Sequence, residues 1–125
     1  RRTIEKADLY AKITAHLGLP PESVVNEYGM TELSSQFYTR GLGRPHIHPA
    51  WARGLVIHPE TNAEVLDGET GVLRLFDAAN LGSCCAIQTR DLAIRRGDDF
   101  ELLGRDPAAL PRGCSRAADE MLSST

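Results

Sequence analysis

A short stretch near the start of the chain decides the fold class. After the apolar pair Val24-Val25, the chain reads Asn26-Glu27-Tyr28-Gly29-Met30-Thr31-Glu32. An apolar strand that breaks at a glycine and then presents a hydroxyl and a carboxylate is how α/β enzymes place polar groups at the carboxyl edge of a sheet. The stretch therefore predicts a strand that ends at a ligand site.

The composition predicts a soluble domain with a real core. The chain has 125 residues, of which 42% are hydrophobic and 25% charged. A net charge of −3 without a basic cluster argues against a nucleic-acid surface. No apolar run has membrane-spanning length, and three cysteines, two of them adjacent, are more typical of a reduced protein than of a disulfide scaffold. We expect a cytoplasmic protein, and the absence of a methionine before Arg1 favours a piece of a longer polypeptide.

Hydrophobic spacing predicts one helix followed by short strands. Apolar residues recur at helical spacing from Thr3, a candidate cap together with Asp8, to Leu17, and Gly18 ends the helix. A buried strand over 24–26, a turn at Gly29 and a short helix over 33–38 follow. Beyond an irregular loop over 41–49, turn residues separate short apolar runs. The predicted strands cover 54–58, 63–66, 71–76, 84–88, 92–95 and 100–103, and a terminal helix covers 115–122. The expected fold class is α/β in a mixed α+β form, a helix and strand that lead into a small, mostly antiparallel β-subdomain.

The first motif has side chains suited to nucleotide chemistry. The ring of Tyr28 can stack on a purine, Gly29 lets backbone approach a ligand, and the Glu32 carboxylate can hold Mg²⁺ beside phosphates. The plainer alternative is a loop in which Thr31 caps a helix and Glu32 favours the helix dipole.

Two later groups extend this pattern. Asp91 follows a predicted strand and can accept hydrogen bonds from ribose hydroxyls, or it can simply form a turn between two strands. Arg105, after Gly104, can pair with a phosphate or carboxylate ligand, or with an acidic side chain at the surface.

In this order, the three groups resemble the core motifs of the adenylate-forming superfamily. At the level of individual residues, the sequence resembles the acyl-protein synthetases over nearly the whole chain. These are the long-chain fatty acid–protein ligases of the bacterial luminescence system and their relatives. The stretches that carry the resemblance are Asn26 to Tyr38, Ala86 to Asp91, Leu103 to Arg105, and Arg112 to Ser115.

The resemblance implies an enzyme that uses ATP and Mg²⁺ to activate a fatty acid as an acyl-adenylate and then transfers the acyl group to a protein thiol. It implies that Tyr28, beside Gly29, lies against adenine and that Thr31 contacts the phosphate or the acyl-adenylate. Glu32 would bind Mg²⁺, Asp91 would hold the ribose, and Arg105 would lie near the hinge. Cys114 would accept the acyl group as a thioester, although an incidental thiol is an equal alternative.

The same resemblance divides the chain and implies partners. Residues 1–50 would form the end of the α/β adenylation core with the first motif, and residues 51–125 the β-subdomain with the other two motifs and the tail. The phosphate-binding loop of the superfamily is absent, and Lys12 is the last lysine, so this segment alone is expected to be inactive. Acyl-reductase and acyl-transferase proteins are the expected partners. Apolar surface left by a missing neighbour favours self-association.

Three alternatives remain open on the sequence. A coenzyme A ligase of the phenylacetate type shares the motif order, and a non-catalytic binding or assembly module would keep the shape without turnover. Zinc binding would use soft ligands, but their spacing is not that of a structural zinc pair. These ligands are His46, His48, His58, Cys84 and Cys85.

Overall fold

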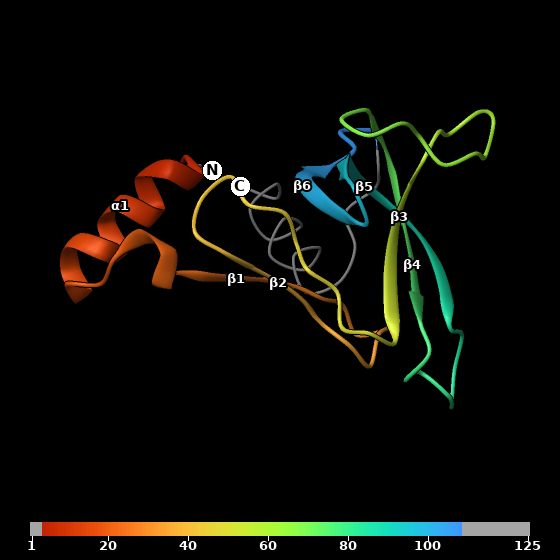
Figure 1. Ribbon diagram of the computed structural model, residues 1–125, viewed down its shortest axis with the longest axis horizontal. Coiled ribbons are helices and arrows are strands. Elements are labelled where there is room, and N and C mark those ends of the chain that lie inside the picture. The colour runs from red at the N-terminus through yellow and green to blue at the C-terminus, as the bar shows by residue number, and fades with distance from the viewer. Residues whose placement is uncertain (1–3, 109–125) are drawn as a thin grey trace, which may run out of the picture.

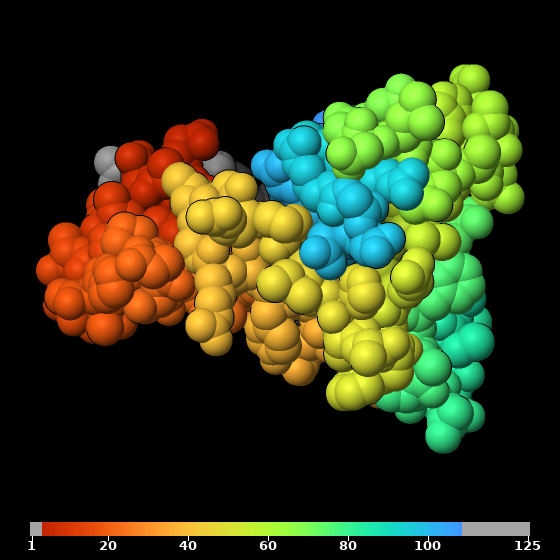
Figure 2. Space-filling view, in the orientation of Figure 1, coloured from red at the N-terminus to blue at the C-terminus, as the bar shows by residue number. Residues whose placement is uncertain are grey.

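The computed structural model describes residues 4–108, which form an α-helix, a 3-10 turn and two antiparallel sheets. The helix lies at one end of the molecule and the four-stranded sheet at the other, with the two-stranded sheet between them (Figure 1). In the space-filling view, the segment that follows β2, coloured yellow-orange, lies between the two ends (Figure 2). The elements are α1 (Lys6–Leu17), η1 (Pro21–Ser23), β1 (Val25–Tyr28), β2 (Phe37–Arg40), β3 (Ala52–Ile57), β4 (Thr70–Asp77), β5 (Ala86–Arg96) and β6 (Asp99–Arg105).

The helix α1 confirms the helical spacing of the first segment. It ends at Gly18, whose φ of 64° is the left-handed conformation that glycine adopts at helix ends. Its N-cap is Glu5, which makes no side-chain capping hydrogen bond, so Asp8 lies in the first turn rather than at the cap. Of its side chains only Tyr10 is buried. Across residues 4–108, no helix has the length and apolar character needed to cross a membrane.

The larger sheet is a meander in the order β3-β4-β5-β6. Inward-facing residues alternate along β4, where Gly71, Leu73, Leu75 and Asp77 are buried while their neighbours are more exposed. The smaller sheet pairs β1 with β2, so that Tyr28 faces Phe37 across the ladder. Two isolated bridges connect the loop after β2 to both sheets, because Ile47 pairs with Tyr38 and His46 pairs with Phe100.

Four predicted elements differ in the structure. The helix predicted over 33–38 is wrong, because residues from Phe37 onward alternate between buried and exposed and pair with β1 as a strand. The strand predicted over 63–66 is also wrong, since this segment makes only an isolated bridge between Glu64 and Ile57. The strands predicted over 84–88 and 92–95 are one strand, β5, that contains a bulge instead of a break. The helix predicted over 115–122 lies outside the described residues.

A cluster of rings joins the two sheets. The ring centroid of Phe100 lies 5.8 Å from that of Tyr28, 5.5 Å from that of Phe37 and 5.3 Å from that of His46, on which it stacks. His46 is 1% exposed, and neither ring nitrogen has a hydrogen-bond partner among residues 4–108. Burial, and next the positive charge of Lys6, lower the pKa of His46, so the ring packs as a neutral aromatic group.

The Phe100 ring fits because Gly54 has no side chain. A Cβ atom at position 54 would lie 2.6 Å from the ring carbons of Phe100, and 3.4 Å from a methyl group of Leu73. Phe100 is itself fully buried, so it has no space into which to move.

Gly54→Ala should therefore destabilise the fold by roughly 1–3 kcal/mol, because the added methyl group overpacks the core. The free energy of unfolding in urea measures the effect. Gly82→Ala is the matched control, since nothing lies within 4 Å of a Cβ atom at position 82. Equal stabilities for the two variants would contradict the packing described for Phe100.

Candidate functional site

The bulge in β5 sets the position of Asp91. Leu92 pairs with Val72 of β4 and Gln88 pairs with Arg74, so Leu73 alone faces the three residues 89–91. The Thr89 hydroxyl donates to the Leu73 carbonyl at 2.7 Å and accepts from the Asp91 amide at 3.1 Å. This side chain thus replaces the ladder hydrogen bonds that the bulge removes, and bulges of this kind commonly re-aim a side chain beside a ligand site.

Tyr28, at the end of β1, approaches the same carboxylate from the other sheet. Its hydroxyl donates to Asp91 Oδ2 at 2.6 Å. Burial, and next the hydrogen bond to Asp91 and the negative charge of Asp91, raise the pKa of Tyr28. The phenol therefore remains a donor at neutral pH. Among residues 4–108, no donor reaches the other oxygen of Asp91, which leaves that oxygen to accept from a ligand.

Arg105 lies beside Asp91 across the next ladder. The two residues are direct partners in the β5–β6 pairing. A second bulge precedes this pair, because Leu92 pairs with Gly104 and Ala93 pairs with Leu102, which leaves Leu103 without a direct partner. Gly104 borders this bulge with a φ of 131°, a conformation that side chains disfavour. The positive charge of Arg105 lowers the pKa of Tyr28, against the larger effects of burial and of Asp91 that raise it.

Thr31 and Glu32 lie in the loop that follows Tyr28. Both are exposed, and the Thr31 hydroxyl donates to Glu32 Oε2 at 3.1 Å. The backbone of this loop is held from the turn that follows β4, since Asn80 Nδ2 donates to the Glu32 carbonyl at 2.8 Å. The two side chains are thus presented to solvent from a fixed backbone.

Asp77, the last residue of β4, holds the far end of the same loop. Its Oδ2 accepts from the backbone amides of Ser34, at 2.9 Å, and Ser35, at 2.7 Å. Its Oδ1 accepts from the Ser35 hydroxyl at 2.8 Å and from the Ala79 amide at 3.0 Å. Burial raises the pKa of Asp77, but the hydrogen bonds from Ser35, Ala79 and Ser34 lower it more, so the net pKa lies below its ordinary value.

Sequence reasoning missed Asp77. The available signal is its place in β4, because it follows Leu73 and Leu75 at a spacing of two and therefore faces the core. A carboxylate at a core-facing position requires several donors, and three of the four come from the loop that carries the first motif.

These elements enclose a pocket of about 290 Å³. It contains all of the predicted site residues within the described part of the chain, although the first motif and Asp91 lie more than fifty positions apart in the sequence. The predicted residue Cys114 lies outside the described residues. The lining consists of Tyr28, Gly29, Met30, Thr31, Glu32, Ile87, Gln88, Thr89, Arg90, Asp91 and Arg105.

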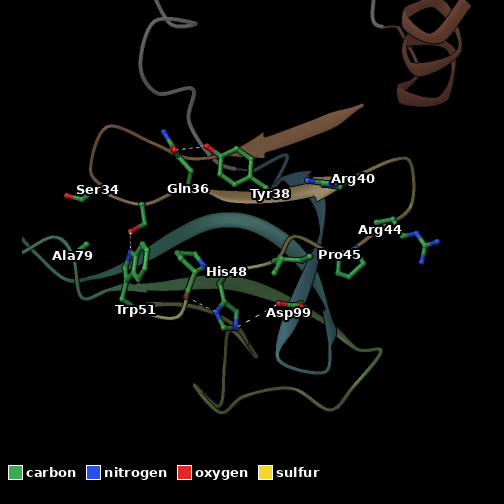
Figure 3. A pocket seen from close by; sticks show the side chains of 13 residues that line it. Ser34, Gln36, Tyr38, Arg40, Arg44, Pro45, His48, Trp51, Ala79 and Asp99 are labelled. Carbon is green, nitrogen blue, oxygen red and sulfur yellow. Dashed lines mark hydrogen bonds and ion pairs between the residues drawn. The ribbon is translucent and has the colours of Figure 1, made fainter. Parts of the chain in front are cut away.

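A larger and mainly apolar pocket, of about 840 Å³, is lined by Ser35 and by its neighbours Ser34 and Gln36 (Figure 3). Trp51 lines it and donates its indole N–H to the Ser35 hydroxyl at 2.9 Å. His48 also lines it, with Nε2 3.9 Å from Asp99 Oδ1. Trp51 thus connects the hydrogen bonds of Ser35 and Asp77 to this second pocket. Residues 29–36, between β1 and β2, are called the first-motif loop below.

The proposed zinc ligands do not form a cluster. His46 is buried against Phe100, whereas Cys84 and Cys85 are exposed in the β4–β5 loop. The predicted strand over 84–88 would include both cysteines, but β5 begins only at Ala86. Over residues 4–108, no three His, Cys, Asp or Glu side chains converge as a metal site.

Comparison with known proteins gave a likeness in structure. No protein-family model and no curated protein sequence matches the chain. Similar solved structures include a luciferase-like enzyme from the nonluminescent mealworm Zophobas morio, at 17% identity and a TM-score of 0.61, over 83% of this chain and 30% of that one. Apo MatB from Rhodopseudomonas palustris is similar at 19% identity and a TM-score of 0.63, over 87% of this chain and 25% of that one. McyG A-PCP complexed with phenylalanyl-adenylate is similar at 16% identity and a TM-score of 0.60, over 89% of this chain and 25% of that one.

The chain thus spans 25–30% of the length of these three structures. At such low identities the likeness shows the fold alone. It confirms the expected fold class, a mixed α and β fragment of the fold of adenylate-forming enzymes.

Asp77→Asn should destabilise the chain by roughly 1–3 kcal/mol at pH 7, because an amide NH₂ would face buried donors. Since the folded pKa of Asp77 is below its ordinary value of 3.8, its contribution is complete above that pH and is lost as the pH falls through the lowered pKa. Urea unfolding at several pH values measures both effects.

Asp67→Asn is the matched control, because its exposed carboxylate accepts a single described hydrogen bond, from the Gly97 amide. Equal losses in the two variants at pH 7 would contradict the role of Asp77 as the anchor of the first-motif loop.

Proposed function

We propose that this chain forms the ribose- and phosphate-facing part of an ATP-dependent ligase that activates a carboxylic acid as an acyl-adenylate. The observation that carries the proposal is the pocket in which Tyr28, Thr31, Glu32, Asp91 and Arg105 meet. A carboxylate, a hydroxyl and a cation around one small pocket match the donors and acceptors of a nucleotide. The fold of the chain supports the same reading.

Each side chain has a definite task in this proposal. Asp91 accepts from ribose hydroxyls with the oxygen that Tyr28 leaves open, and the hydrogen bond from Tyr28 fixes the orientation of the carboxylate. Thr31 donates to the α-phosphate, where charge develops as the carboxylate of the acid attacks. Arg105 offsets the same charge from the neighbouring strand. Tyr28 is 8% exposed, so its contact with adenine uses the small part of the residue that lines the pocket.

Glu32 is the residue that would hold Mg²⁺. It is an exposed carboxylate at the pocket wall, next to the Thr31 hydroxyl. Mg²⁺ is commonly bound through one or two protein carboxylates together with substrate phosphates, so a single carboxylate fits this ion when a nucleotide is present. The ion would neutralise charge on the phosphates.

The finer proposal concerns the acid and the acceptor. We propose a fatty acid as substrate and a protein thiol as acceptor, as in acyl-protein synthetases, with Cys114 as that thiol. Acyl-reductase and acyl-transferase proteins would be the partners. A phenylacetate-type coenzyme A ligase and a non-catalytic binding module are the competing proposals, and acyl transfer to coenzyme A or the absence of turnover would favour them.

Asp91→Ala and Glu32→Gln, introduced into the whole natural polypeptide, should each lower fatty-acid-dependent ATP–pyrophosphate exchange. Loss of a charged hydrogen-bond acceptor predicts a decrease of about ten- to a hundredfold. Asp98→Ala is the control, because this residue lies in the exposed β5–β6 turn and does not line the pocket. An unchanged rate of ATP–pyrophosphate exchange in both pocket variants would contradict the assignment of these residues to the site.

Cys114→Ser should retain exchange but lose covalent acylation of the protein, because adenylate formation does not use the thiol. Labelling with a radioactive fatty acid, followed by hydroxylamine treatment of the denatured protein, detects the thioester. A variant that is still labelled in a hydroxylamine-sensitive manner would remove Cys114 from the scheme.

A further inference from the structure

The loop between β4 and β5 carries two adjacent thiols at the surface. Cys84 and Cys85 are both exposed, whereas unpaired cysteines are among the most buried residues of folded proteins. The proposed activation chemistry does not use either of them. The Cys84 thiol donates to the Ala86 carbonyl at 3.0 Å, so one sulfur already has a defined place at the start of β5.

The backbone of this pair is bonded to the residues that hold the first-motif loop. Asn80 Nδ2 donates to the Cys84 carbonyl at 3.0 Å and to the Glu32 carbonyl at 2.8 Å. Asn80 Oδ1 accepts from the Ser34 hydroxyl at 3.1 Å. The Asp77 amide donates to the Cys85 carbonyl at 2.8 Å. A change in the peptide group between the two cysteines therefore reaches Glu32 and Ser34 through a single side chain.

We propose that Cys84 and Cys85 form a thiol-oxidation site in which a peroxide closes a disulfide between the neighbours and thereby loosens the first-motif loop. A thiolate attacks one oxygen of hydrogen peroxide and the O–O bond breaks, which gives a sulfenic acid and a hydroxide that takes up a proton as water. The second thiolate attacks the sulfenic sulfur, the S–S bond forms, and the hydroxide that leaves takes up the other proton. In sum, two thiols and one peroxide give one disulfide and two waters.

The adjacency of the two residues decides what this disulfide does. Consecutive Cα atoms are about 3.8 Å apart, whereas disulfides usually join Cα atoms about 4.4–6.8 Å apart. Closure must therefore twist the peptide group between them, and its oxygen is the Cys84 carbonyl that Asn80 holds. Strained and exposed disulfides are readily reduced, so the site is a reversible modification and not a structural bridge.

Oxidation of the 125-residue chain with hydrogen peroxide tests the proposal without any nucleotide, so its outcome is independent of the proposed function. Mass spectrometry should find that the peptide with both cysteines loses two hydrogens, in the native chain and in Cys114→Ser alike. Trp51, the only tryptophan, reports on the loop because it bonds Ser35. Its emission should shift on oxidation and return with dithiothreitol.

Two variants separate the chemistry from its transmission. Cys85→Ser should show neither the disulfide nor the shift. Asn80→Ala should form the disulfide with a smaller shift, because its link to Glu32 and Ser34 is gone. Oxidation that instead gives a bridge to Cys114, a bridge between chains or only sulfinic acid would overturn the site. A disulfide without a shift, or with an equal shift in Asn80→Ala, would overturn its action on the loop.

Discussion

The packing of Phe100 against Gly54 is the constraint on which the rest of the structure depends. The ring occupies the space of a missing side chain in β3 and contacts Tyr28, Phe37 and His46 from the other sheet and its following loop. Most of the large apolar side chains of the core are buried within this arrangement. Because Tyr28 belongs to the cluster, its hydroxyl lies within hydrogen-bond distance of the Asp91 carboxylate, whose position is set by the bulge in β5. One aromatic contact thus joins the two halves of the candidate site.

Rigid backbone and open side chains are combined at this site. Asp77 and Asn80 hold the loop after Tyr28 through its amides and a carbonyl, while Thr31 and Glu32 remain exposed. A buried carboxylate that accepts four hydrogen bonds is a strong anchor, because every donor removed would leave it partly unsatisfied. The loop can therefore offer a hydroxyl and a carboxylate to a ligand without being reordered when the ligand binds.

The two motifs could be found in the sequence because their spacing is local. Residues 28–32 follow an apolar pair, and residues 89–91 follow an apolar run, so each reads as polar groups at the end of a strand. Their meeting could not be derived, since it depends on a bulge bridged by the Thr89 hydroxyl and on the pairing of Asp91 with Arg105. Asp77 could not be found for a similar reason, because three of the four hydrogen bonds to it come from a loop more than forty positions earlier. The strand β2 was not predicted, because residues 34–36 before it are polar and the alternation of buried and exposed side chains covers only Phe37–Arg40.

A structure of the whole natural polypeptide with a non-hydrolysable acyl-sulfamoyl adenosine tests the central claim most directly. The account predicts that the ribose hydroxyls lie within hydrogen-bond distance of Asp91, about 2.5–3.2 Å, with Tyr28 still bonded to the other carboxylate oxygen. The sulfamoyl group should lie beside Thr31. An analogue bound elsewhere, with Asp91 bonded only to Tyr28, would contradict the assignment of this pocket to a nucleotide.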